Sequence, residues 1–178
     1  RMMERINSQT FFERTMKNIH IIIAVSGLLL VGMNCGKPLT AEALFTQAET
    51  KRNVSNNSGA IEDLSKLLEL YPDHDLASKT QYFIGDIYMN NIKDFEAAIT
   101  AYKKVVESYS GSGLEANAQF MVGFIYANYI QNLDSAKKEY DQFLNQFPDH
   151  DLYDDVQFEL QYLGKDINQI DALKNIAS

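Results

Sequence analysis

A repeating unit of 38 residues constrains the fold of this chain more than any other feature. The phrase YPDHDL at residues 71–76 returns as FPDHDL at 147–152, two periods later, and YSGSGL at 109–114 is the middle copy. Apolar positions recur at the same interval: Leu76/Leu114/Leu152, Tyr82/Phe120/Phe158, Ile87/Ile125/Leu163, Ala60/Ala98/Ala136, Leu64/Tyr102/Tyr140 and Leu68/Val106/Leu144. Such self-similarity indicates stacked structural units that share one continuous core.

Each repeat is predicted to contain two helices. Apolar residues follow helical spacing within SKTQYFIGDIYMN, residues 78–90, and again within FEAAITAYKKVVESY, residues 95–109. Turn-forming stretches interrupt this pattern near residues 53–59, 71–75, 91–94, 109–113, 130–134 and 147–151. The sequence therefore predicts an all-α fold of seven antiparallel helices over residues 39–164, arranged as a right-handed stack.

The repeated turn also predicts where helices end and begin. Pro72 and Pro148 are expected to end the preceding helices, because proline lacks a backbone donor and clashes with the turn before it. Asp75 and Asp151 are predicted to be the N-caps of the next helices, where they would accept hydrogen bonds from free backbone amides.

The Asp-His-Asp sequences at residues 73–75 and 149–151 also contain potential metal ligands. Adjacent side chains point in divergent directions, however, and this spacing is not that of a metal site. The middle copy has Ser110-Gly111-Ser112 in the same place. A turn is therefore the favoured interpretation, and neither a metal site nor a cofactor is predicted.

The repeated residues resemble the tetratricopeptide repeat. That family has a glycine followed three residues later by tyrosine on the first helix of each unit, as in Gly85/Tyr88 and Gly123/Tyr126. On the second helix it has an alanine, then a large residue, then a proline: Ala60/Leu64/Pro72, Ala136/Tyr140/Pro148, and Ala98/Tyr102 with Ser110 in place of proline. The usual unit is about 34 residues long, so each unit here is extended. One extra residue falls between Gly85 and Ala98.

The resemblance covers about residues 39–164 and implies a right-handed α-solenoid of about three helix-turn-helix repeats plus a C-terminal capping helix. The first repeat matches less well, with Ala48 and Lys51 at the places of the glycine and tyrosine. In this family, side chains of the first helix of each unit line a concave groove that binds a peptide or a partner helix. Carried over by alignment, the groove residues are Tyr82, Asp86, Met89, Asn90, Phe120, Phe124, Asn128, Phe158 and Tyr162.

The aromatic residues among these candidates allow two interpretations. Tyr82, Phe120 and Phe158 would pack between repeats if the stripe is part of the core, which is the usual role of aromatic residues at helical spacing. Phe124 and Tyr162 are expected to be the more exposed. An exposed aromatic stripe edged with Asn and Asp would suit an extended peptide.

The N-terminal region contains the only strongly apolar run, residues 19–33. The arrangement MKNIHIIIAVSGLLLVGMNCGK, residues 16–37, resembles a bacterial lipoprotein signal peptide, which implies lipidation of Cys35 and a membrane anchor. An uncleaved anchor and an ordinary cleaved signal are the alternatives. In bacterial lipoproteins an Asp directly after the cysteine favours retention in the inner membrane, so the resemblance and Gly36 together favour the outer membrane. The predicted organisation is 1–15 upstream extension, 16–34 signal peptide, 35–38 linker, 39–164 repeat domain and 165–178 tail or short capping helix.

Composition and motifs narrow the function. The formal net charge of −8 argues against nucleic-acid binding, which needs a basic surface. The sequence shows no catalytic motif and no motif for a small-molecule substrate. We therefore expect a non-catalytic, membrane-anchored adaptor or scaffold for protein partners in the periplasm. The chain resembles the helical lipoprotein of the β-barrel assembly machinery and the Tol–Pal-associated coordinator. A structural accessory role through self-association, or a part in outer-membrane protein assembly, is the alternative.

Overall fold

The computed structural model describes residues 38–165. The predicted extension, signal peptide, Cys35 and residues 166–178 of the predicted tail lie outside the described residues. The chain divides into two units at Leu39, and the described part of the unit that begins there contains its own hydrophobic core. Among residues 38–165, no helix is both long enough and apolar enough to span a membrane.

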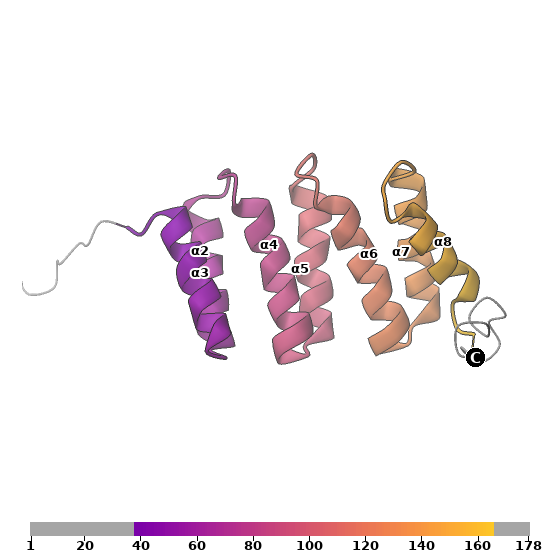
Figure 1. The fold of residues 1–178 in the computed structure, drawn as a ribbon, viewed down its shortest axis with the longest axis horizontal. Coiled ribbons are helices and arrows are strands. Elements are labelled where there is room, and N and C mark those ends of the chain that lie inside the picture. Colours follow the sequence, from indigo (N-terminus) through magenta and orange to yellow (C-terminus); the bar gives the residue numbers. More distant parts are fainter. Residues whose placement is uncertain (1–37, 166–178) are drawn as a thin grey trace, which may run out of the picture. The chain divides into compact units, whose positions relative to one another are not determined.

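The described unit is a row of helix pairs (Figure 1). Its α-helices are α2 (Ala41–Asn53), α3 (Asn57–Leu70), α4 (Ala77–Asp86), α5 (Phe95–Ser108), α6 (Glu115–Ile125), α7 (Leu133–Gln146) and α8 (Tyr153–Tyr162). Two short π-helical segments, η1 (Ile87–Ile92) and η2 (Tyr126–Ile130), continue α4 and α6. The predicted all-α solenoid of helix-turn-helix repeats is confirmed, and α8 is the first helix of a fourth unit. We call the first helix of each repeat helix A and the second helix B.

The 38-residue period is the period of the helices themselves. Helix B begins at Asn57, Phe95 and Leu133, and helix A of the later repeats begins at Ala77, Glu115 and Tyr153. Each helix B has a side-chain cap, because Asn56, Asp94 and Asn132 accept hydrogen bonds from the backbone amides of Gly59, Ala97 and Ser135. Local capping therefore fixes the same starting point in each repeat.

Close packing of helix A on helix B explains the glycines. A Cβ atom on Gly85 would lie 2.7 Å from Cε1 of Tyr102, and one on Gly123 would lie 2.6 Å from Cδ1 of Tyr140. Both tyrosines are fully buried. Only a residue without a side chain therefore allows the tyrosine ring to rest on the backbone of helix A.

A π-helical turn accommodates the extra residue between Gly85 and Ala98. The amide of Asp94 donates to the carbonyl oxygen of Tyr88 at 3.0 Å, across the segment η1. Lys93 then reverses the chain with a positive φ of 65°. The next repeat uses the same device, with η2 followed by Gln131 at a φ of 59°. An added residue inside a helix is a typical origin of a π-bulge.

The predicted aspartate N-caps are wrong. Helices α4 and α8 have Leu76 and Leu152 at the N-cap position, with no side-chain capping bond. Asp75 and Asp151 are exposed one residue earlier. Leucine is tolerated at these two N-cap positions because the histidine of the turn accepts a hydrogen bond from the leucine backbone amide.

The histidines are the structural residues of the repeated turn. Nδ1 of His74 accepts a hydrogen bond from the Leu76 amide, and Nδ1 of His150 accepts one from the Leu152 amide, each at 3.1 Å. In the middle copy, Oγ of Ser112 accepts the equivalent bond from the amide of the following leucine at 3.3 Å.

In the part of the chain that the structure describes, no three His, Cys, Asp or Glu side chains gather as a metal site would require.

Candidate functional site: a pocket between α2 and α4

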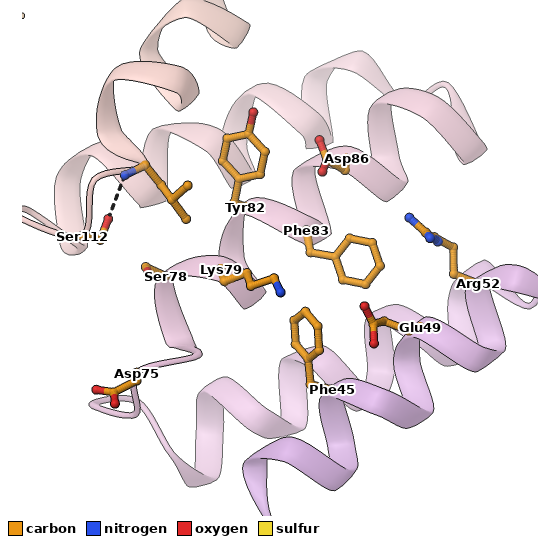
Figure 2. Close-up of a pocket in the computed structure, with 11 residues that line it drawn as sticks. Phe45, Glu49, Arg52, Asp75, Ser78, Lys79, Tyr82, Phe83, Asp86 and Ser112 are labelled. Carbon is orange, nitrogen blue, oxygen red and sulfur yellow. Dashed lines mark hydrogen bonds between the residues drawn. The ribbon is translucent and has the colours of Figure 1, made fainter. Parts of the chain in front are cut away.

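A pocket of about 570 Å³ lies between α2, α4 and the loop and turn that lead into α6 (Figure 2). Its walls are helix A of the first repeat and helix A of the second, and its size is typical of ligand pockets. We call it the α2/α4 pocket. The side chains that determine its chemistry are Phe45, Glu49, Arg52, Lys79, Tyr82, Phe83 and Asp86.

Two phenylalanine rings form the apolar part of the pocket. Phe45 on α2 and Phe83 on α4 have ring centroids 5.6 Å apart, and both side chains are buried. The Arg52 guanidinium lies 4.8 Å from the Phe83 ring centroid, and the Lys79 ammonium lies 4.9 Å from that of Phe45. Cation–π attraction therefore holds two positive groups at the edge of an aromatic surface.

Asp86 and Tyr82 form the polar part of the pocket wall on α4, and the buried Tyr102 contacts both of them from behind. The Tyr102 hydroxyl donates to Oδ1 of Asp86 at 2.7 Å, and the ring of Tyr82 meets that of Tyr102 edge to face at 5.0 Å. Burial raises the pKa of Asp86, although the Tyr102 hydrogen bond and the charge of Arg52 oppose this. Burial, with a smaller contribution from Asp86, raises the pKa of Tyr82 to about 12. Tyr82 is therefore a neutral hydrogen-bonding group.

The pocket contains charges of both signs. Glu49 and Asp75 are exposed carboxylates that line it, in addition to Asp86 and the two cations. Figure 2 shows Glu49 and Arg52 on α2 facing the α4 side chains. Such a site can bind an apolar side chain on the aromatic surface and hydrogen-bond or pair with polar groups on either side of it.

The predicted groove residues are divided by the structure. Tyr82 and Asp86 line the α2/α4 pocket. Met89 is buried in the core between the second and third repeats, whereas Asn90 is exposed and does not line the pocket. The predicted stripe is therefore not one continuous surface in the second repeat.

In the third repeat, Phe120 and Phe124 are both half-buried, with ring centroids 5.9 Å apart. The Phe124 ring also meets that of Tyr129 at 6.1 Å. Asn128 is exposed, and its side-chain amide donates to the carbonyl oxygen of Phe124 at 3.0 Å. This hydrogen bond uses one of the two side-chain amide protons of Asn128, a predicted groove residue.

On α8, Phe158 is 39% exposed while Tyr162 is half-buried, and their ring centroids lie 4.6 Å apart. The expected difference in exposure is therefore absent in the third repeat and reversed on α8. The reason is geometric: α8 has no helix B against it among the described residues, so the ring that would lie between helices is open.

Of the seven side chains that determine the chemistry of the pocket, five were missed from the sequence: Phe45, Glu49, Arg52, Lys79 and Phe83. A signal for two of them was present. Because Ala48 stands in the place of Gly85, Phe45 and Glu49 occupy the places of Tyr82 and Asp86. Because the first repeat lacks the glycine–tyrosine pair, no residue of α2 was included in the predicted groove, although α2 forms one wall of the pocket.

Comparison with known proteins agrees with this architecture. Two sequence models of the tetratricopeptide repeat match the chain, one at residues 78–111 and the other at residues 42–74 and 117–150. The matches fall on the three complete helix pairs and together cover more than half of the chain. No curated protein sequence matches it. Tetratricopeptide repeats suggest a module for binding proteins or peptides. The chain belongs to the tetratricopeptide-repeat family.

Proposed function

We propose that this protein is a non-catalytic adaptor that binds an extended peptide segment of a partner protein in the α2/α4 pocket. The observation that supports this is the aromatic surface of Phe45 and Phe83, framed by Arg52 and Lys79 on facing A helices. Proteins of this family are typically non-catalytic interaction modules.

The pocket favours a peptide with an apolar side chain next to a carboxylate. The apolar side chain would cover the two phenylalanine rings, and the carboxylate would approach Arg52 or Lys79. On the other side of the pocket, Asp86 accepts the hydrogen bond of Tyr102 at Oδ1. Its second oxygen, Oδ2, can therefore accept a hydrogen bond from a backbone amide of the peptide. Aromatic and arginine side chains are the residue types that most often dominate binding energy at protein interfaces.

Site-specific photocrosslinking tests this proposal directly. A photoreactive residue at Ser78, in the pocket, should form a covalent adduct with the partner in intact cells, and one at Lys66, exposed on α3, should not. Lys79→Glu in the Ser78 background should abolish the adduct, whereas Lys66→Glu should leave it intact. Equal crosslinking from both positions, or an adduct that is insensitive to Lys79→Glu, would place binding on another surface.

We place this activity at a membrane of the bacterial cell envelope, with the repeat domain in the periplasm and the outer membrane favoured. The support is the signal-like sequence before Cys35 and the Gly36 that follows it. The partners to test first are components of β-barrel assembly and of the Tol–Pal system, because the chain resembles repeat proteins of both. Mass spectrometry of the Ser78 adduct would identify which one, if either, is bound.

Self-association is a second candidate, and a specific observation favours it. Phe158 on α8 is a large exposed aromatic side chain at the last described helix of the solenoid. Two copies that pack through α8 would cover it. Light scattering on residues 39–178 should then report a dimer that Phe158→Ser converts to a monomer, and a wild-type monomer at all concentrations would exclude this role.

A further inference from the structure

A second groove of about 550 Å³ lies between α3, α4 and α5, among residues unrelated to the α2/α4 pocket. We call it the α3/α5 groove. Its apolar lining consists of Ile61, Leu68, Ile84, Tyr88, Ala97 and Ala101. Concave, mostly apolar sites of about 300 to 1,000 Å³ with a few polar groups are the usual form of small-molecule sites.

The next repeat contains the same groove in a filled form. Between α5, α6 and α7 the corresponding cavity is about 280 Å³. One period after Ser65 comes Lys103, and one period after Ala101 comes Glu139. Nζ of Lys103 lies 2.8 Å from Oε1 of Glu139 and 5.7 Å from the ring centroid of Tyr126. The Lys103 side chain therefore reaches from α5 to the Glu139 carboxylate on α7, with its ammonium near the Tyr126 ring, and takes up part of the space that is open in the first groove.

In the first groove, the corresponding space over Tyr88 has no such side chain, because Ser65 and Ala101 are too short to reach across it. The comparison indicates which shape the groove accepts. Its counterpart is spanned by one linear side chain, that of Lys103, whose ammonium end lies near a tyrosine ring. An added linear alkyl chain over Tyr88 would bury apolar surface that is now partly exposed, which is favourable in water.

The charges indicate which end group such a chain carries. Lys104 is the single charged residue that lines the α3/α5 groove, and it is exposed at the edge. The carboxylate that pairs with a cation in the next repeat is replaced by Ala101 here. A positively charged end group would therefore meet only Lys104, whereas a carboxylate would be attracted to it.

From these observations we propose that the α3/α5 groove binds a linear fatty acid. The alkyl chain lies over Tyr88, and the carboxylate lies next to Lys104. The binding is non-covalent and reversible, and it is independent of peptide binding in the α2/α4 pocket.

Titration of residues 39–178 with decanoate, below the concentration at which it aggregates, tests the proposal. Two-dimensional amide NMR should show saturable shifts at Ser65, Thr100 and Lys104, and none at Ser78 or Lys79 in the other pocket. Octanoate should bind about tenfold more weakly, because each buried methylene contributes a similar increment of affinity. Absence of saturable shifts, or shifts confined to the α2/α4 pocket, would overturn the proposal.

Two variants test the groove and the end group separately. Ser65→Lys with Ala101→Glu copies the ion pair of the next repeat, so the fold should tolerate it, and decanoate binding should weaken at least tenfold. Lys104→Ala should weaken decanoate about two- to fivefold, as expected for an exposed ion pair, and leave decanol unchanged. Lys79→Ala is the matched control and should change neither affinity. Unchanged decanoate binding by the double variant would overturn the proposal, and the wild-type amide shifts decide the matter even if that variant fails to fold.

Discussion

Tyr102 donates its hydroxyl proton to Asp86 across the second repeat, over 2.7 Å. The same place in the third repeat has no such pair. Tyr140 is the counterpart of Tyr102, but Phe124 is the counterpart of Asp86, and the buried Tyr140 hydroxyl has no hydrogen-bond partner among the described residues. Two repeats with the same arrangement of helices therefore differ in the polar contact between helix A and helix B.

Loss of the Asp86 carboxylate is expected to destabilise the repeat domain. Asp86→Ala would leave the Tyr102 hydroxyl without its partner in a largely buried place, at a cost of about 1 to 3 kcal/mol. Urea denaturation of residues 39–178 measures this. Tyr102→Phe in the Asp86→Ala background should recover part of the loss, because it removes the unsatisfied hydroxyl. If Asp86→Ala is as stable as the wild type, the hydrogen bond makes no net contribution.

The stability of the wild type relative to Asp86→Asn is expected to depend on pH. Burial raises the pKa of Asp86 in the folded protein, so the folded state binds this proton more tightly than the unfolded chain does. The resulting stabilisation is fully present below the unfolded pKa and is lost as pH rises through the folded pKa. The difference in unfolding free energy, wild type minus Asp86→Asn, should therefore decrease from acidic to neutral pH. A difference that increases over that interval would contradict the direction of the pKa shift.

A side chain at Gly123 is expected to disrupt the contact between α6 and α7. Gly123→Ala would place a methyl group against the Tyr140 ring and destabilise by about 1 to 3 kcal/mol through overpacking. Tyr140→Leu should largely rescue this variant, because the first repeat combines Ala48 with Leu64 at the same places. Thermal unfolding of the single and double variants measures the coupling. Additive losses would mean that the glycine is not required by the tyrosine.

The left-handed residue after the π-helical turn is expected to prefer glycine. Lys93 has a φ of 65°, a conformation that costs a residue with a side chain about 1 to 2 kcal/mol. Lys93→Gly should therefore stabilise by about 0.5 to 1 kcal/mol, after allowance for the greater flexibility of glycine in the unfolded chain. Chemical denaturation measures this, with Lys93→Ala as a control that removes the charge but keeps the Cβ atom. An equal gain from Lys93→Ala would assign the effect to charge.

The proposed lipidation of Cys35 predicts that removal of its thiol abolishes lipid anchoring. Cys35→Ser cannot be lipidated, so the protein should move to the soluble periplasmic fraction or accumulate as an unprocessed precursor. Cell fractionation and metabolic labelling with a palmitate analogue detect this. Unchanged fractionation together with an unlabelled wild type would instead favour an uncleaved anchor.

The sequence by itself determined the number and order of the helices and the approximate positions of the turns between them. Its 38-residue spacing, the Asn or Asp before each helix B and the glycine under each large aromatic are local or short-range features. Hydrogen bonds within a turn and contacts between consecutive helices depend on residues that are near one another in the chain. For this reason a repeating pattern is sufficient to predict them.

Only the tertiary structure decided which surfaces are open. Met89 was predicted to line a groove but is buried, and Arg52 lies over a phenylalanine of the next repeat. Whether the space over Tyr88 is open depends on Ser65, one helix pair earlier. The exposure of a side chain depends on the size of the residues that neighbouring repeats place against it. The 38-residue period aligns equivalent backbone positions, but it does not determine which side chains stand there.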